Sequence, residues 1–184
     1  MNSKLALLLW NQLGAAIDML ANAMEMCPDQ LWSHPENWNA GATELKTLDT
    51  YKPEFWYNAY HVLFWTDYFL SNTAEEDFQP PAPFGKEEFD DRGLIPPRVY
   101  TKTELLDYLN HCRNRCRAFI NSLSDQSLFE NSQTTFRQDY PVLEVLLYNL
   151  RHVQHHTAQL NLLLRQEIDS APRWVGRTKL PLVE

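Results

Sequence analysis

The chain has 184 residues, and because 44% of them are hydrophobic it is long enough to bury one core. Its 16 Lys and Arg residues are outnumbered by 24 Asp and Glu residues, and the formal net charge of -8 excludes broad electrostatic attraction to nucleic acid or to anionic lipid. We therefore expect a single domain over residues 1–184 with no nucleic-acid or membrane partner.

The first predicted element is a long amphipathic helix that ends before Cys27-Pro28. Ser3 is placed to cap it, and Pro28 ends it because proline disfavours the helical conformation of the residue before it. The apolar run 5–10 is too short for the core of a signal peptide, and no stretch approaches the ~18 apolar residues of a membrane span. We expect a cytoplasmic protein. The apolar residues that recur at helical steps are Leu5, Leu8, Leu9, Leu13, Ile17, Leu20 and Met24.

A second helix is predicted from Pro53 to about Asn72, after a polar connection over 28–52 that has room for one helical turn. A long proline-rich loop over 73–100 follows, with five prolines and two glycines. Loops beyond ~12–15 residues are uncommon in compact domains and often form lids or binding loops. The sequence leaves open whether this loop is a lid or a solvated connector.

Two further helices complete the predicted fold. Thr101 and Glu104 have the spacing of a capping box, which starts a third helix that ends near Ser122. A fourth helix opens at Pro141 and continues to about Ile168, and an extended tail over 170–184 follows it. Four long helices without strand patterns predict an all-α four-helix bundle with the long loop between its second and third helices.

Cys112 and Cys116 lie four residues apart in the third predicted helix and share one of its faces. With one further cysteine, Cys27, the count suits a reducing compartment and has no spacing typical of a disulfide framework. A redox or metal pair is one alternative. We interpret the pair as buried small hydrophobes and assign it no role.

The chemistry of the sequence is concentrated in the fourth helix, where His152, His155 and His156 fall within five residues. His152 and His156 differ by about 40° around a helix, so both imidazoles can approach one ion from consecutive turns. His155 lies nearly opposite the apolar stripe of the helix, and we expect it to face solvent or a neighbouring element. The pattern therefore predicts His152 and His156 as two ligands of a metal ion.

A third ligand is predicted in the second helix, where His61 is the only histidine and stands among aromatic residues. Three imidazoles leave a further coordination position for water or substrate, which is typical of a catalytic metal site. The alternative is that these histidines only pack or form hydrogen bonds. The sequence has no Gly-rich phosphate loop and no G-x-S-x-G nucleophile motif.

Three polar residues are candidates for catalytic or pocket roles. Tyr148 and Gln159 project near the His152 edge of the fourth helix, and Asn58 lies one turn before His61. The alternatives are a packed tyrosine and a solvated glutamine. No carboxylate is placed well enough to be named as a general base.

These residues resemble the DinB-like superfamily, also described as YfiT-like, whose last long helix carries the pattern H-x-x-HH-x-G-Q-L. Residues 152–160 read HVQHHTAQL, with Ala158 where the pattern has glycine. The family's third ligand lies in the second helix, in the place that His61 occupies. Residues 27–32 also resemble the polar turn after the family's first helix.

The resemblance implies zinc, nickel or a similar divalent ion as the metal, and a homodimer as the assembly. Relatives include thiol-dependent S-transferases and isomerases, and hydrolases, so the reaction is constrained only coarsely. We expect a metal-dependent enzyme that acts on a small molecule, either as a thiol S-transferase with a low-molecular-weight thiol or as a hydrolase. The second hypothesis is a non-catalytic metal-binding protein with a stress-response or interaction role.

Overall fold

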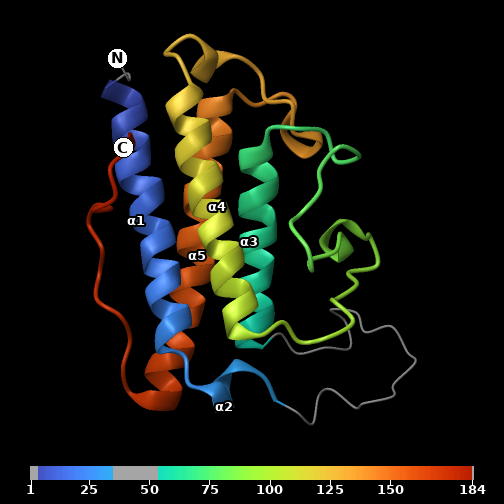
Figure 1. Ribbon diagram of the computed structural model, residues 1–184, viewed down its shortest axis with the longest axis vertical. Helices are drawn as coiled ribbons and strands as arrows, with labels where there is room; N and C mark the ends of the chain where they lie inside the picture. The colour runs from blue at the N-terminus through green and yellow to red at the C-terminus, as the bar shows by residue number, and fades with distance from the viewer. Residues whose placement is uncertain (1–3, 35–53, 184) are drawn as a thin grey trace.

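The computed structural model describes residues 4–34 and 54–183. Four long helices pack side by side (Figure 1), and the described ranges contain no β-strand. The predicted all-α bundle is confirmed. None of the helices in these ranges is both long and apolar enough to cross a lipid bilayer. The long helices are α1 (Lys4–Met26), α3 (Phe55–Ser71), α4 (Lys102–Ser122) and α5 (Val142–Ile168).

The four helices form a square in which α1 and α3 each pack against both α4 and α5. α1 and α5 run in one direction, and α3 and α4 run in the other (Figure 1). Because α3 and α4 are parallel neighbours, the chain that joins them must return along the whole length of the bundle. This topology requires the long connection between α3 and α4.

The helix boundaries follow local chemistry. The capping box of α4 is formed in both directions: the Glu104 amide donates to Thr101 Oγ1 at 3.2 Å, and the Thr101 amide donates to Glu104 Oε2 at 2.8 Å. The single helical turn expected after the first helix is α2 (Asp29–Trp32). The predicted cap Ser3, residues 35–52 and Pro53 lie outside the described residues.

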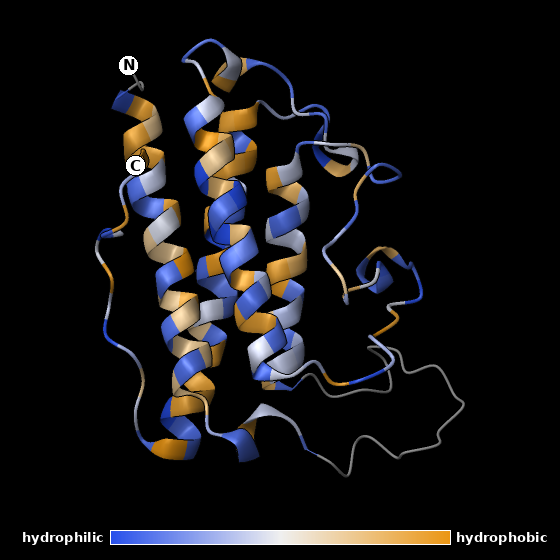
Figure 2. Cartoon of the chain, viewed as in Figure 1, coloured by the Kyte–Doolittle hydropathy of each residue, from blue (hydrophilic) through white to orange (hydrophobic). Residues whose placement is uncertain are grey.

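The interior of the bundle is apolar and rich in aromatic side chains. Figure 2 shows hydrophobic residues alternating with polar ones along the four helices, as the amphipathic patterns predicted. Cys112 and Cys116 are fully buried, and burial raises the pKa of the Cys116 thiol to about 12. Both cysteines are free, and they fill the core as small apolar groups.

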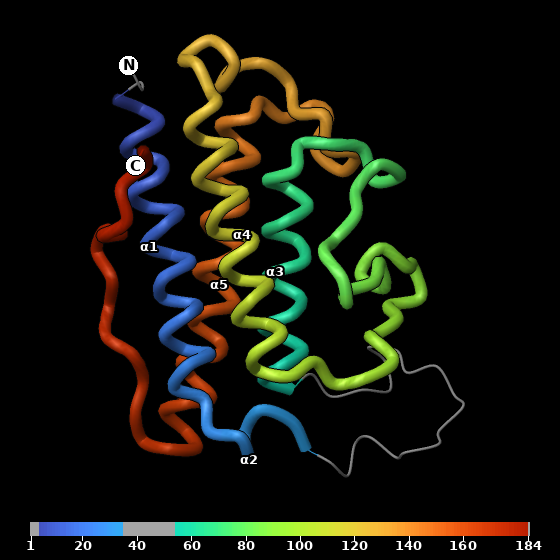
Figure 3. The backbone as a smooth tube through the Cα atoms, in the orientation of Figure 1, coloured from blue at the N-terminus to red at the C-terminus, as the bar shows by residue number. Residues whose placement is uncertain are grey.

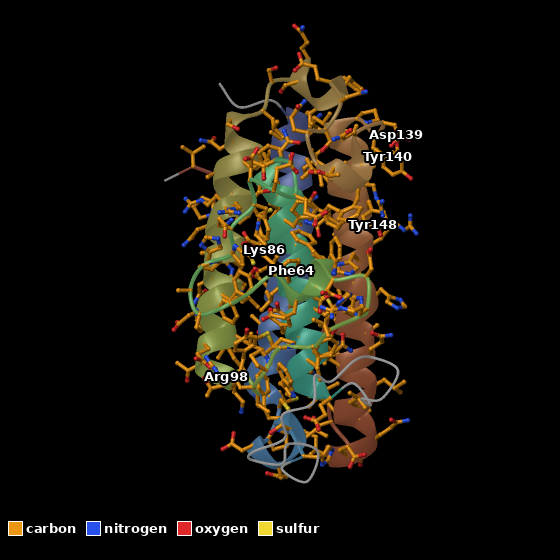
Figure 4. All side chains as sticks on the ribbon, turned by 90° about the vertical axis from the view of Figure 1, so that its right-hand side faces the viewer. Phe64, Lys86, Arg98, Asp139, Tyr140 and Tyr148 are labelled. Atoms are coloured by element: carbon orange, nitrogen blue, oxygen red, sulfur yellow. The ribbon has the colours of Figure 1, made fainter. Side chains whose placement is uncertain are left out.

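The connection between α3 and α4 is a packed cover on the outer face of α3. It crosses in front of Phe64 in the view of Figure 4, and it contains the short helix η2 (Glu87–Phe89). Phe84 stacks on Tyr108 of α4 with ring centroids 4.3 Å apart, and the Phe89 ring lies 4.9 Å from that of Phe64. These buried contacts exclude a purely solvated connector. Two further short helices, η3 (Ser127–Phe129) and η4 (Thr135–Arg137), lie between α4 and α5.

The C-terminal tail runs back along α1 after α5 ends (Figure 3). The Thr178 amide donates to the carbonyl of Asn11 at 3.2 Å, and its hydroxyl donates to the Asp18 carboxylate at 2.7 Å. Gly14 permits this close approach, because a Cβ there would lie 2.7 Å from Thr178 Cγ2.

Candidate metal centre

The bundle brings His61, His152 and His156 together. His61 lies on α3, and the other two occupy consecutive turns of α5, which packs antiparallel to α3. One ring nitrogen from each of the three histidines lies within 4.8 Å of the others. The Nε2 atoms of His61 and His152 are 3.4 Å apart. The three histidines predicted as ligands therefore form one cluster.

A hydrogen bond from His61 to Glu88 orients the His61 ring. His61 Nδ1 lies 2.7 Å from Glu88 Oε2. An ionised carboxylate only accepts hydrogen bonds, so Nδ1 carries a hydrogen and Nε2 is the nitrogen left to bind a metal ion. This nitrogen faces the other two histidines.

A chain of three hydrogen bonds orients His156. Its Nδ1 donates to Asn58 Oδ1 at 2.7 Å, Asn58 Nδ2 donates to Gln159 Oε1 at 3.2 Å, and Gln159 Nε2 donates to His155 Nε2 at 3.2 Å. The amide oxygen of Asn58 can only accept a hydrogen bond, so the hydrogen of His156 lies on Nδ1. Its Nε2 lone pair is therefore also available to a metal ion.

Burial keeps His152 and His156 neutral. Desolvation, followed by the proximity of the other histidines, lowers the pKa of His152 to about 3 and that of His156 to about 4. Metal ions bind the neutral imidazole, so the rings are held in the form that can coordinate. Three imidazoles fit a divalent ion of intermediate softness, such as zinc or nickel.

Glu88 was not predicted from the sequence, yet its carboxylate accepts three hydrogen bonds beside the histidines. Its side chain is 5% exposed, and it accepts hydrogen bonds from Tyr57 Oη at 2.8 Å, His61 Nδ1 at 2.7 Å and Trp65 Nε1 at 2.9 Å. Burial alone would raise the pKa of Glu88, but the three hydrogen bonds, that of His61 first among them, outweigh burial and lower it. The only signal in the sequence was a pair of acidic residues in the long loop.

A pocket of about 420 Å³ opens beside His61 and His156. Two of the three polar candidates, Asn58 and Gln159, line this pocket. A larger cavity of about 680 Å³ lies under the C-terminal tail and includes none of the three histidines. The smaller pocket is the candidate functional site, because His61 and His156 form part of its walls. Its lining residues are Tyr57, Asn58, His61, His156, Gln159, Leu162 and Leu163.

The remaining candidate, Tyr148, lies elsewhere on α5. Figure 4 labels Tyr148 on α5. Its ring centroid is 5.3 Å from that of Phe69 and 4.5 Å from the Arg137 guanidinium, and it does not line the pocket. The structure therefore places Tyr148 in a packing position. His155 is exposed, as the helical angles predicted.

Comparison with protein families matches residues 12–160 to the DinB superfamily. The match begins within α1, ends within α5 and includes all three clustered histidines. No curated protein and no solved structure matches the chain.

Proposed function

Because the chain belongs to the DinB superfamily, we propose that it is a divalent-metal-dependent enzyme that acts on a small molecule. Its ion would be held by the Nε2 atoms of His61, His152 and His156. The observation that carries the proposal is the meeting of three imidazoles from two helices, with two of their Nε2 atoms 3.4 Å apart. Zinc and nickel both suit this set of donors.

The residues around the histidines support a catalytic site. Three protein ligands leave a coordination position open, and an ion bound there would stabilise the deprotonated form of a water or thiol. Glu88 and Asn58 each hold one ligand ring through its Nδ1 hydrogen. The adjoining pocket falls in the size range of small-molecule sites, about 300–1,000 Å³.

We place thiol S-transfer first among the reaction classes and hydrolysis second. Hydrolysis usually needs a general base near the attacking water. Among the described residues that line the pocket there is no carboxylate, and both oxygens of Glu88 are engaged by Tyr57, His61 and Trp65. A thiol has a pKa closer to neutrality than water, so coordination alone is enough to deprotonate it.

Metal analysis of purified protein tests the site. We expect one zinc or nickel ion per chain in the wild type and in His111→Ala, because His111 lies on α4, where it forms a hydrogen bond with Asp67 and has no contact with the cluster. His61→Ala and His156→Ala should lose stoichiometric metal. Full metal content in both of these variants would refute the ligand assignment.

Turnover assays on the metal-loaded protein test the reaction. Consumption of small electrophiles that requires both the ion and an added low-molecular-weight thiol supports S-transfer. Consumption of a hydrolysable substrate without any thiol would instead support hydrolysis. A loaded protein that is inert with both substrate panels would favour a non-catalytic metal-binding role.

A further inference from the structure

We infer that the pocket beside the histidines selects a small, uncharged and mostly apolar substrate that carries a neutral oxygen acceptor. The inference deepens the proposed function, because it concerns the molecule that would react next to the metal ligands. Recognition by the pocket walls does not itself require an ion, so the two proposals can fail separately.

Part of the pocket lining is apolar. Leu162 and Leu163 come from the last turns of α5, and the Tyr57 ring comes from α3. Leu162 is 55% exposed and presents its side chain to the open pocket. An apolar molecule that covers these side chains removes apolar surface from water, which stabilises the complex by about fourfold in affinity per buried methylene.

The described walls of the pocket carry no charged side chain. Of the described residues that line the pocket, none is Lys, Arg, Asp or Glu. An ionic group bound there would lose hydration without gaining an opposite charge. Glu88, whose hydrogen bond to His61 holds it behind that ring, adds negative charge nearby and further disfavours an anion. Arg165 on α5 lines the neighbouring groove with Met19, and not this pocket.

The unused amide hydrogens of Asn58 and Gln159 determine which polar group of a substrate the pocket can bind. Asn58 Nδ2 and Gln159 Nε2 each use one amide hydrogen, for Gln159 and His155 respectively. A side-chain amide has two such hydrogens, so each residue retains one donor. These donors suit a neutral carbonyl, nitro or ether oxygen. At about 420 Å³ the pocket has room for a molecule of about one or two rings.

A matched pair of ligands tests the selection. 1-Naphthamide is neutral and has a carbonyl acceptor, whereas 1-naphthoate has nearly the same shape and a negative charge. Binding of each to metal-free protein would be measured by calorimetry in the presence of EDTA. We expect naphthamide to bind at least about tenfold more tightly, because burial of the carboxylate costs its hydration. Equal binding, tighter binding of naphthoate, or no binding of naphthamide would overturn the inference.

Three variants locate the bound probe. Leu162→Glu places a charge in the pocket, and Leu147→Glu makes the same change at a leucine of α5 that is 46% exposed and lies outside the pocket. Leu162 also borders a groove with Trp174, so Trp174→Ala serves as a second control. We expect naphthamide affinity to fall at least about tenfold in Leu162→Glu and to change less than about twofold in both controls. An equal loss in either control would place the probe elsewhere and overturn the inference.

The outcome can be separated from that of the proposed function. Stoichiometric metal without selective binding of naphthamide would overturn the substrate class and leave the metal centre intact. Selective binding of naphthamide together with a failure of the purified protein to take up zinc or nickel would leave the pocket intact and refute the metal-dependent reaction.

Discussion

The Nε2 atoms of His61 and His152 lie 3.4 Å apart, although 91 residues separate these histidines in the chain. Glu88 holds a hydrogen of His61 on the opposite nitrogen, so Nε2 is directed toward α5. A cation shared by these nitrogens would link α3 to α5 near the middle of the bundle.

The first prediction concerns metal removal. A ligand that binds only the folded state stabilises it, by about 2.7 kcal/mol when its free concentration is 100 times its Kd. Addition of EDTA should therefore lower the Tm of zinc-loaded wild-type protein. His61→Ala should unfold at the same temperature with and without EDTA. Thermal unfolding followed by circular dichroism measures both, and an equal response of the two proteins would contradict a site at His61.

The second prediction concerns Glu88. Glu88→Gln keeps the shape of the side chain but removes the negative charge that orients His61. Loss of such an orienting group typically weakens metal binding by about 10–100-fold, and we expect a loss in this range. Competition with a chromophoric chelator measures it. Glu76→Gln is the matched control, because Glu76 is an exposed acid of the same loop. A Kd for Glu88→Gln equal to that of the control would remove the orienting role.

The third prediction concerns pH. Because burial lowers the pKa of His152 to about 3 and that of His156 to about 4, the unfolded chain binds protons on these rings below pH 6.5 while the folded metal-free protein does not. Their contribution to stability is therefore complete above pH 6.5 and is lost as the pH falls toward 4. For two protons the slope approaches about 2.7 kcal/mol per pH unit.

Urea unfolding in EDTA at several pH values between 7 and 4.5 measures this slope. The double variant His152→Gln/His156→Gln should have a shallower slope in the same window. The contribution of Glu88 to stability also decreases as the pH falls, but Glu88 is present in both proteins, so it does not affect the comparison. Parallel pH profiles would contradict the assignment of neutral, partly buried rings to His152 and His156.

The fourth prediction concerns a buried carboxylate on another face of α3. Asp67 is fully buried and accepts hydrogen bonds from Arg115 Nη1 at 2.9 Å, His111 Nε2 at 3.1 Å and Tyr108 Oη at 3.2 Å. Asp67→Ala leaves these donors without their acceptor, and we expect it to reduce the free energy of unfolding by about 3 kcal/mol. Metal content should not change.

Asp90→Ala provides the comparison for Asp67, because Asp90 forms an ion pair with Arg92 in the loop at the surface. Exposed ion pairs contribute little to stability, so chemical denaturation should detect no change in this variant. If Asp67→Ala changed the free energy of unfolding as little as Asp90→Ala does, the buried network would have no structural role.

Much of the fold follows from local patterns in the sequence. The spacing of apolar residues predicted the long helices, and the Thr101–Glu104 pair marked the start of α4 within one residue. Helical angles were also enough to group His152 with His156 and to separate His155. Each of these features depends on residues that are close in the sequence, where helix geometry determines the relation between side chains. Assembly as a homodimer and location in the cytoplasm stay predictions.

The contacts that could not be predicted depend on tertiary structure. Glu88 reaches His61 only because the loop crosses α3 at one height, and no local pattern specifies that height. The prediction that Tyr148 lies near His152 used only the angle between the two residues around the helix axis. Side chains on a helix lean toward its N-terminus, so Tyr148 points away from the histidines toward Phe69 and Arg137, whereas Gln159 leans back toward Asn58.

The long separation between the ligands has a consequence for the order of folding. His61 and His152 can meet only after α5 has docked on α3, and contacts between residues so far apart in sequence form late because loop closure opposes them. The metal-free chain must therefore build most of its bundle from apolar contacts before three imidazoles are available together. We expect the ion to be captured by a nearly native protein, with little effect on the rate of folding and a large effect on the rate of unfolding.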